Sequence, residues 1–202
     1  MRICPHCRAA LDERDERCPG CAVDLRGADL RADDPIVGTT LAGRYLIEAC
    51  VGAGAMARVY RACVIASGAE VAVKVLFPDE AADEMVLRRF QQEVRATGRL
   101  RHPNNLALLD SGETDRGQAF LVMEFLRGRT LETVIRDEAP LDPARVVRLL
   151  GPALDALAEA HSAGVVHGDF KPSNVFVTTG ADGAERVKVI DYGVARLRGE
   201  GD

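Results

Sequence analysis

The chain has 202 residues and a net charge of −5 at pH 7, and 47% of its residues are hydrophobic and 28% charged. This length suffices for one full domain and a small one, and the composition is that of an ordinary globular protein. Because the chain is acidic and has no run of Lys and Arg, the sequence does not support nucleic-acid binding through a basic surface, and we expect no nucleic-acid partner. Because neither a signal peptide nor roughly 18 consecutive apolar residues is present, we expect a cytoplasmic chain without a membrane segment.

The first 24 residues contain four of the six cysteines, in the motifs "CPHC" (4–7) and "CPGC" (18–21). Two such pairs can supply four thiolates to one tetrahedral ion, and clustered cysteines in a cytoplasmic chain favour a metal over redox disulfides, which are the alternative. We therefore predict a zinc ribbon over residues 1–24 that needs its metal to fold. The predicted Zn2+ ligands are Cys4, Cys7, Cys18 and Cys21.

Residues 25–40 are rich in Asp and Gly, show little periodicity and are predicted to be a linker. From about residue 41 the pattern becomes globular, and its apolar period changes from strand to helix and back. Predicted strands cover 44–51, 57–65, 70–77, 105–113, 118–126, 174–179 and 186–191, and predicted helices cover 83–100 and 142–164. The order indicates an α+β fold rather than a regular alternation of strands and helices.

The second predicted helix has its own start signal and a predicted buried side. Asp142 is placed to cap its N-terminus, and Pro143 occupies the first helical position. The residues expected on its inward side are Val146, Leu150, Leu154, Leu157 and His161.

Gly52 and Gly54 lie in "VGAGAMARVY" (51–60), between two runs with strand character. A dinucleotide-binding glycine motif would open a helix at this point and is disfavoured. A glycine turn between strands can instead direct backbone N–H groups at the oxygens of a triphosphate. Lys74 follows in the apolar strand "VAVK", where the alternative is a lysine that points to solvent. Glu93 lies near the inward side of the first helix and needs a cation there, for which Lys74 is the candidate.

The segment "HGDFKPSN" (167–174) sets an acid, a lysine and an amide at close spacing. Asp169 can accept or orient the proton of an attacking hydroxyl, and Lys171 can neutralise a phosphoryl group in transfer. Asn174 can offer its carbonyl oxygen to Mg2+, and Asp191 in "VIDYG" can bridge metal and phosphates. Each acid alone could be a turn or cap residue, but the polar residues in this order indicate phosphoryl transfer.

With these motifs in order, residues 44–196 resemble the eukaryotic-like Ser/Thr protein kinases of bacteria. The resemblance also covers "RFQQEVRATGRLRHPN" and "LVMEFLRGRTL". It implies a kinase-like N-lobe, built from an antiparallel sheet and one helix, and a partial helical C-lobe. The implied partial kinase domain covers 41–202, with the N-lobe at 41–124 and the hinge and incomplete C-lobe at 125–202.

The resemblance implies ATP and Mg2+ as cofactors, a protein as substrate, and a role for each matching residue. Asp169 and Lys171 would be catalytic, and Asn174 and Asp191 would bind magnesium. The residues implied to bind the nucleotide are Gly52, Gly54, Val59, Ala72, Lys74, Glu93, Glu124, Leu126, Asn174 and Asp191.

The chain also departs from the family pattern. Ala57 replaces the third glycine of the turn, Tyr192 replaces the usual Phe, and Gly168 replaces the Arg before the catalytic Asp. The sequence stops eleven residues after Asp191, so we expect a kinase domain truncated after the magnesium-binding loop. An apolar face of the helix at 142–163 would then be exposed or would bind a partner.

Two other functions stay open. One is a non-catalytic module that binds a nucleotide or a partner, with the zinc ribbon as a second contact surface. The other is a phosphotransferase that acts on small molecules, since "HGD" followed by Asn174 also occurs in relatives of that kind. "VAVK" and "KPSN" favour the protein kinase.

Overall fold

The computed structural model describes residues 2–3, 10–11, 16–17, 34, 36–54, 56–77, 84–180, 182–192 and 196–197. The chain forms two compact units. The first unit comprises residues 1–86 and 109–125, and the second comprises 87–108 and 126–202. Near the N-terminus, β1 (Arg2–Ile3) and β2 (Ala10–Leu11) pair antiparallel.

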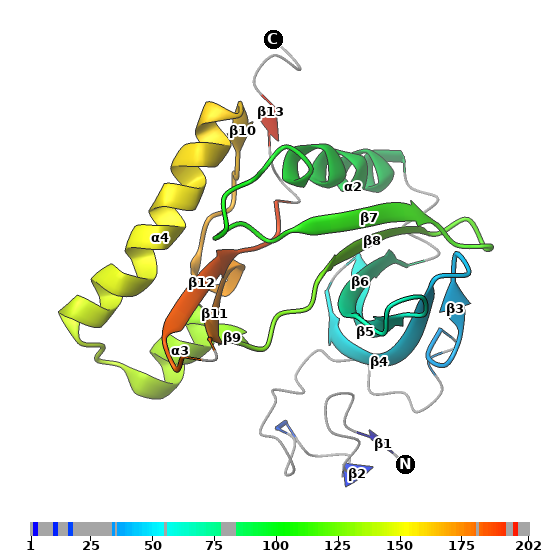
Figure 1. Ribbon diagram of the computed structural model, residues 1–202, viewed down its shortest axis with the longest axis horizontal. Helices are drawn as coiled ribbons and strands as arrows, with labels where there is room; N and C mark the ends of the chain where they lie inside the picture. The colour runs from blue at the N-terminus through cyan, green and yellow to red at the C-terminus, as the bar shows by residue number, and fades with distance from the viewer. Residues whose placement is uncertain are drawn as a thin grey trace. The chain divides into compact units, whose positions relative to one another are not determined.

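The first unit is built on a curled six-stranded sheet in the order β3-β4-β5-β6-β8-β7 (Figure 1). Antiparallel pairing connects β3 to β4, β4 to β5, β5 to β6 and β6 to β8. Its strands are β3 (Thr40–Leu41), β4 (Tyr45–Ala53), β5 (Ala57–Val64), β6 (Glu70–Leu76), β7 (Leu108–Glu113) and β8 (Ala119–Glu124). The strand predictions for this part of the chain are confirmed, although β7 begins three residues later and β8 ends two residues earlier than expected. The short strand β3 was not predicted.

One face of this sheet carries the core of the first unit. Val71, Val73 and Val75 alternate along β6 and are at most 2% exposed, as the period of a strand with one buried face requires. Tyr60 from β5 and Phe120 from β8 belong to the same cluster. The intervening residues of each strand therefore point to the opposite face of the sheet.

The second unit combines helices with a small sheet. Its three-stranded sheet has the order β12-β11-β9, and β10 pairs with β13. The elements are α2 (Glu84–Thr97), whose first three residues belong to the first unit, β9 (Gly128–Thr130), α3 (Leu131–Glu138), α4 (Pro143–Ser162), β10 (Val165–Val166), the 3-10 turn η1 (Pro172–Asn174), β11 (Val175–Thr179), β12 (Glu185–Val189) and β13 (Arg196–Leu197). The predicted helices, the final hairpin and the α+β class are confirmed. The sequence analysis missed the eight-residue helix α3, whose first turn Thr130 caps by accepting a hydrogen bond from Thr133 N at 3.2 Å.

Helix α4 begins where the sequence predicts, but it buries a different side. The Asp142 carboxylate accepts a hydrogen bond from Arg145 N at 3.1 Å, and Pro143 occupies the first turn. The predicted inward stripe is wrong, because Leu154 is 57% exposed and the buried positions are Leu149, Ala153, Ala156 and Ala160. Alanine lets the helix lie close to the strands it covers, so the small side chains mark the contact face. Leu150 and Leu157 pack at its margin.

No helix among the described residues combines the length and the apolar composition needed to cross a bilayer. This observation concerns only the described part of the chain.

Gly128 provides a test of the packing in the second unit. It has φ 154°, and a Cβ atom there would lie 2.0 Å from the carbonyl oxygen of Val177 in the neighbouring strand. Gly128→Ala should lower the free energy of unfolding by about 3 kcal/mol through backbone strain and overpacking. Gly151→Ala is the matched control, since a Cβ there meets open space in the middle of α4. That control should gain about 0.5–1 kcal/mol in helix propensity. Urea denaturation measures both, and equal stabilities for the two variants would contradict the close approach.

Candidate active site

The glycine turn of the first unit joins two strands. Gly52 lies in β4 opposite Val59 in β5, and Gly54 N donates a hydrogen bond to the carbonyl oxygen of Ala57 at 2.9 Å. The pairing slips between Cys50 and Gly52, which bends β4 as it enters the turn. The strand–turn–strand arrangement agrees with the prediction and differs from the strand–turn–helix of a dinucleotide-binding motif.

The residues expected to line a nucleotide share one face of the sheet. Val59 is paired with Lys74, and Ala72 is paired with Met123 of β8. Directly paired residues point to the same face, and so do residues two apart on one strand. Since Tyr60, Val73 and Val122 fill the core on the other face, Val59, Ala72 and Lys74 project together from the side opposite the core. Lys74 itself is half-buried.

Three other predicted nucleotide contacts are divided between the two units. Glu124 is the last residue of β8 in the first unit, whereas Leu126 and Glu93 belong to the second unit. Glu93 is only 4% exposed on α2, and a carboxylate buried to this degree requires a cation or hydrogen-bond donors. Burial thus agrees with the expected inward position of Glu93, and its pairing with Lys74 stays a prediction.

The second unit holds Asp169, Lys171 and Asn174, which were predicted to serve catalysis and magnesium binding, in direct contact. The Asp169 carboxylate accepts from Lys171 Nζ at 2.7 Å. Asn174 donates through Nδ2 to the Asp169 carbonyl oxygen at 2.9 Å and to its carboxylate at 3.4 Å. The hydrogen bond from Lys171 lowers the pKa of Asp169, and the same contact raises the pKa of Lys171. Asp169 is therefore ionised at neutral pH, as a group that orients or accepts a hydroxyl proton must be.

The two expected magnesium ligands lie at the same end of the β11–β12 hairpin. Asn174 directly precedes β11, Asp191 follows β12, and Ile190 N donates to the Asn174 carbonyl oxygen at 3.0 Å. Because both donated hydrogen bonds of the Asn174 side chain go to Asp169, its amide oxygen is the atom left for a cation. Asp191 adopts φ 63°, a left-handed conformation that is uncommon outside glycine and concentrates at functional sites. An amide oxygen and a carboxylate are suitable ligands for Mg2+.

His167 connects the segment that contains Asp169 to the segment that contains Asp191. It is 2% exposed, and its Nδ1 accepts from Asp169 N at 3.4 Å. Its Nε2 then carries the proton and donates to the Ile190 carbonyl oxygen at 3.1 Å. The ring lies 4.6 Å from that of Tyr192 and 5.9 Å from that of Phe170. Burial lowers the pKa of His167, so the imidazole is neutral and serves to join the catalytic loop to the Asp191 loop.

The sequence analysis missed Asn105, which accepts a hydrogen bond from the Tyr192 hydroxyl at 2.7 Å. Asn105 is 3% exposed and precedes an apolar run, so a polar residue at a predicted buried position was the available signal.

The predicted zinc ligands Cys4, Cys7, Cys18 and Cys21 lie outside the described residues. Among the residues that are described, no group of three or more His, Cys, Asp or Glu side chains could hold a metal ion. Zinc binding accordingly stays a prediction.

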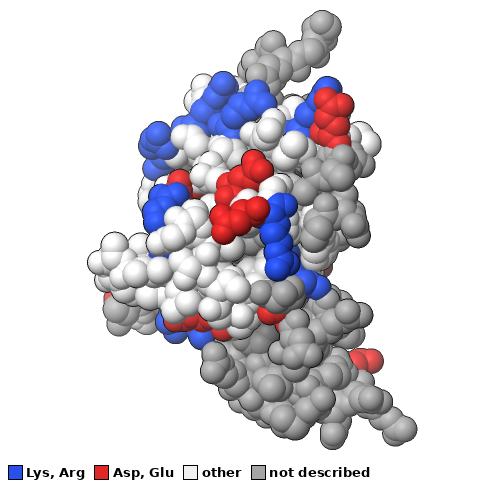
Figure 2. Space-filling model, turned by 90° about the vertical axis from the view of Figure 1, so that its right-hand side faces the viewer, with Lys and Arg blue, Asp and Glu red and all other residues white. Residues whose placement is uncertain are grey.

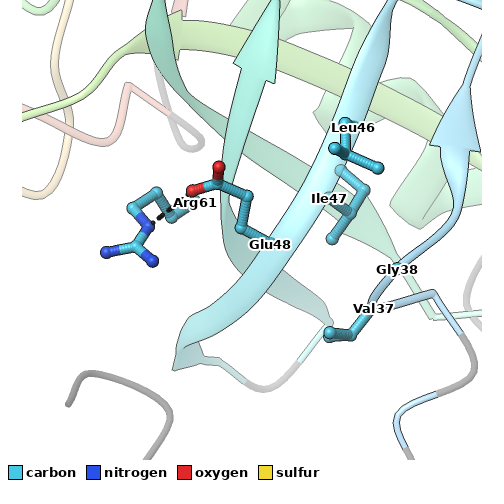
Figure 3. A pocket seen from close by; sticks show the side chains of 6 residues that line it. All are labelled: Val37, Gly38, Leu46, Ile47, Glu48 and Arg61. Carbon is cyan, nitrogen blue, oxygen red and sulfur yellow. Dashed lines mark hydrogen bonds and ion pairs between the residues drawn. The ribbon is translucent and has the colours of Figure 1, made fainter. Parts of the chain in front are cut away.

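The surface depression found in the first unit is not lined by the predicted site residues of that unit. A depression of about 360 Å3 in the first unit is lined by Val37, Gly38, Leu46, Ile47, Glu48 and Arg61, and Arg61 Nε donates to Glu48 at 3.0 Å (Figure 3). None of these residues is a predicted site residue. The face shown in Figure 2 carries both basic and acidic side chains beside uncharged ones.

Comparisons with known proteins agree with this arrangement. The family model described as "Protein kinase domain" matches residues 45–202. The chain is 40% identical over 164 residues to the serine/threonine-protein kinase pkn3 of Myxococcus xanthus, covering 81% of this chain and 30% of that protein. It is 39% identical over 163 residues to PknL of Mycobacterium tuberculosis, covering 81% of this chain and 40% of that protein.

Solved structures give the same result. A crystal structure of the Mycobacterium tuberculosis PknI kinase domain superposes with a TM-score of 0.66 at 35% identity, over 79% of this chain and 63% of that one. The chain thus spans less than half of the curated relatives named above and about two-thirds of the solved domain.

Burial of neutral His167 predicts a specific pH dependence of stability. Its folded pKa lies below its unfolded value, so the unfolded state binds the extra proton and stability falls as pH drops below about 6.5. His167→Gln should remove this contribution, which is at most about 1.4 kcal/mol per pH unit. Chemical denaturation at pH 5.5 and 7.5 gives the free energy of unfolding at each pH, and the quantity compared is the difference between these two free energies. A packing loss that is the same at both pH values does not change this difference. An equal pH difference in parent and variant would contradict the neutral buried state.

Proposed function

Because the chain belongs to the protein kinase domain family, we propose that it forms part of an ATP-dependent serine/threonine kinase of the bacterial type. The reaction transfers the γ-phosphoryl group of MgATP to the hydroxyl of a protein substrate. The observation that carries the proposal is the contact among Asp169, Lys171 and Asn174 at the end of the hairpin that also presents Asp191.

In this function Asp169 orients the attacking hydroxyl and takes its proton. The hydroxyl oxygen forms the new bond to the γ-phosphorus, the bond to the β-phosphate oxygen breaks, and ADP leaves. Lys171, 2.7 Å from the Asp169 carboxylate, neutralises charge on the phosphoryl group during transfer. Both side chains are about half-exposed, which agrees with groups that must meet a substrate from solvent.

Asn174 and Asp191 would hold Mg2+, which supplies charge neutralisation to the phosphates when it is bound. The backbone of the turn at Gly52 and Gly54 would face the phosphates, and Lys74 would bind them as well. Val59 and Ala72 would contact the adenine, which would pair with backbone groups of Glu124 and Leu126. Support comes from the shared sheet face of Val59, Ala72 and Lys74. The proposal assigns this set and the residues of the second unit to one nucleotide.

We also propose that residues 1–24 form a zinc ribbon that contacts a protein partner. The spacing of the two cysteine pairs supports it, and so does the antiparallel pairing of β1 with β2 around the first pair. The apolar side of α4, where Val147 and Leu154 are 70% and 57% exposed, is a second proposed contact surface. A cytoplasmic location completes the proposal.

The non-catalytic module and the small-molecule phosphotransferase remain the alternatives. A pure binding module has no chemical need for the Asp169–Lys171 pair, and retention of this contact favours catalysis. Aminoglycosides and choline offered as acceptors, beside a protein acceptor, distinguish the two kinds of transferase.

Nucleotide binding by the 202-residue chain is tested by thermal unfolding with and without MgATP. MgATP at 100 times its dissociation constant should stabilise the folded chain by about 2.7 kcal/mol. Lys74→Met and Asp191→Asn should each lose most of this shift, whereas Asp182→Asn, in the exposed turn between β11 and β12, should keep it. A melting transition indifferent to MgATP in the parent would exclude the nucleotide site.

Phosphoryl transfer is tested separately with a generic protein acceptor. Asp169→Asn should reduce the rate at least about 100-fold, the lower end of what a positioned general base contributes. Binding of MgATP should stay near the parent value, since Asp169 acts on the acceptor hydroxyl. Equal transfer by the parent and this variant would contradict catalysis through Asp169.

Zinc is tested by metal analysis of the purified chain. We expect one zinc ion per chain, lost in a variant with Cys4 and Cys7 both changed to Ser. A change of Cys50 and Cys63 to Ser is the matched control and should leave the zinc content at one. Metal-free parent protein would exclude the ribbon.

A further inference from the structure

Tyr192 places a hydroxyl group inside the apolar core of the second unit. The residue is 1% exposed and belongs to the cluster that includes Val165, Val175 and Val189. A hydroxyl buried in such surroundings is costly unless it is hydrogen-bonded. The Tyr192 hydroxyl satisfies this need by donating to Asn105 Oδ1 at 2.7 Å.

Asn105 is itself held by α4. Its Nδ2 donates to Glu159 Oε2 at 3.1 Å and to the carbonyl oxygen of Ala156 at 3.3 Å. The other Glu159 oxygen accepts from Arg101 N at 2.9 Å. The chain of hydrogen bonds from Tyr192 through Asn105 to Glu159 thus ends on a helix and on the backbone of the segment before Asn105. Each buried polar group in it has a partner, which is the condition under which such a network adds rigidity.

The backbone around Asn105 is tied to the same hairpin that leads to Asp191. Asn105 forms a parallel bridge with Val189, Leu106 N donates to the Val189 carbonyl oxygen at 2.9 Å, and Val189 N donates to the Asn104 carbonyl oxygen at 2.7 Å. Main-chain and side-chain bonds therefore fix Asn105 relative to the end of β12. This makes Asn105 a firm attachment point for a residue only three positions beyond that strand.

Asp191 lies between two anchored neighbours. On one side, Ile190 is held by His167 Nε2 and by the Asn174 carbonyl oxygen. On the other side, Tyr192 is held by Asn105 and packs its ring 4.6 Å from His167. Between them Asp191 keeps φ 63°, a conformation that persists where the surroundings determine it. Loss of the hydrogen bond from Tyr192 to Asn105 would weaken the attachment on one side of Asp191 while the other side stays fixed.

We propose that the Tyr192 hydroxyl, through Asn105 and Glu159, is a positioning group that holds Asp191 in the conformation that binds magnesium. The proposal rests on the proposed function, which makes Asp191 a magnesium ligand. Tyr192 and Asn105 touch neither the metal nor the nucleotide in this scheme. They act only by limiting the conformations of the residue between Ile190 and Tyr192.

The test separates metal affinity from stability and from nucleotide affinity. Binding of a fluorescent ATP analogue to the full 202-residue chain is measured first in EDTA and then during a magnesium titration. Tyr192→Phe should raise the magnesium concentration at half-maximal effect roughly fivefold, the factor that corresponds to one net hydrogen bond. The dissociation constant of the metal-free nucleotide should stay within about twofold of the parent, because the anchor acts on Asp191 alone.

Tyr60→Phe is the matched control. Tyr60 is also 1% exposed, and its hydroxyl donates to Asp34 at 2.8 Å in the first unit. This variant loses a comparable buried hydrogen bond and should be destabilised to a similar degree, with an unchanged magnesium midpoint. A rise in the midpoint for Tyr60→Phe equal to that for Tyr192→Phe would show a general effect of lost stability and overturn the assignment.

A double-mutant cycle tests whether Tyr192 works through Asn105. Asn105→Leu, which keeps the shape of the side chain, should raise the magnesium midpoint about as much as Tyr192→Phe. The magnesium midpoint of the double variant should be no higher than that of either single variant. Its metal-free unfolding midpoint should fall by less than the sum of the decreases in the two single variants. If the two increases in the magnesium midpoint multiplied in the double variant, Tyr192 and Asn105 would act independently. This result would overturn the proposed chain of hydrogen bonds.

The outcomes also separate this proposal from the proposed function. A parent chain that binds the analogue with no magnesium dependence would overturn the function assigned to Asp191, and the positioning role with it. A parent that binds magnesium normally, with an unchanged midpoint in Tyr192→Phe, would overturn the positioning role alone.

Discussion

The antiparallel register of β11 and β12 is the constraint on which the arrangement of the candidate site residues depends. Val175 pairs with Val189, so the residues just outside the hairpin, Asn174 and Ile190, meet at its open end. Asp191 is carried to the same place. A slip of one residue in this pairing would turn every side chain of one strand to the other face and separate the two expected metal ligands. The hydrophobic pattern of the hairpin packed on α4 is what prevents such a slip.

The polar groups at this end of the hairpin divide into two kinds by burial. Asp169 and Lys171 pair in solvent, where the ion pair adds little to stability and is free to act on a substrate. His167, Asn105 and Tyr192 are buried, and each is hydrogen-bonded, because an unpaired polar group there would be costly. The buried set fixes the loops, and the exposed set contains the two residues to which the proposed function assigns the chemistry. This division explains how two adjacent loops can be rigid in their backbone and accessible at their tips.

Much of the fold could be predicted from the sequence. The valines at alternate positions of β6 mark a strand with one buried face, and Asp142 followed by Pro143 marks the start of α4. Local signals were insufficient in two places. Helix α3 is only eight residues long, so its sequence is too short to show a clear helical period. Helix α4 carries apolar residues on more than one side. The choice of the alanine side is made by the strands against which α4 packs, and these are distant in the sequence.

The sequence by itself determined the kinds of residue available for chemistry and their order along the chain: a glycine turn between strands, Lys74, the acid–lysine–amide set at 169–174, and Asp191. These are local patterns, and each depends on neighbours within a few residues. Only the tertiary structure decided which faces are buried and which polar groups meet. The hydrogen bond between Tyr192 and Asn105 joins residues 87 positions apart, and nothing in either local segment specifies it. Such contacts follow from packing whole elements together, where a buried hydroxyl must find whichever partner the fold brings within reach.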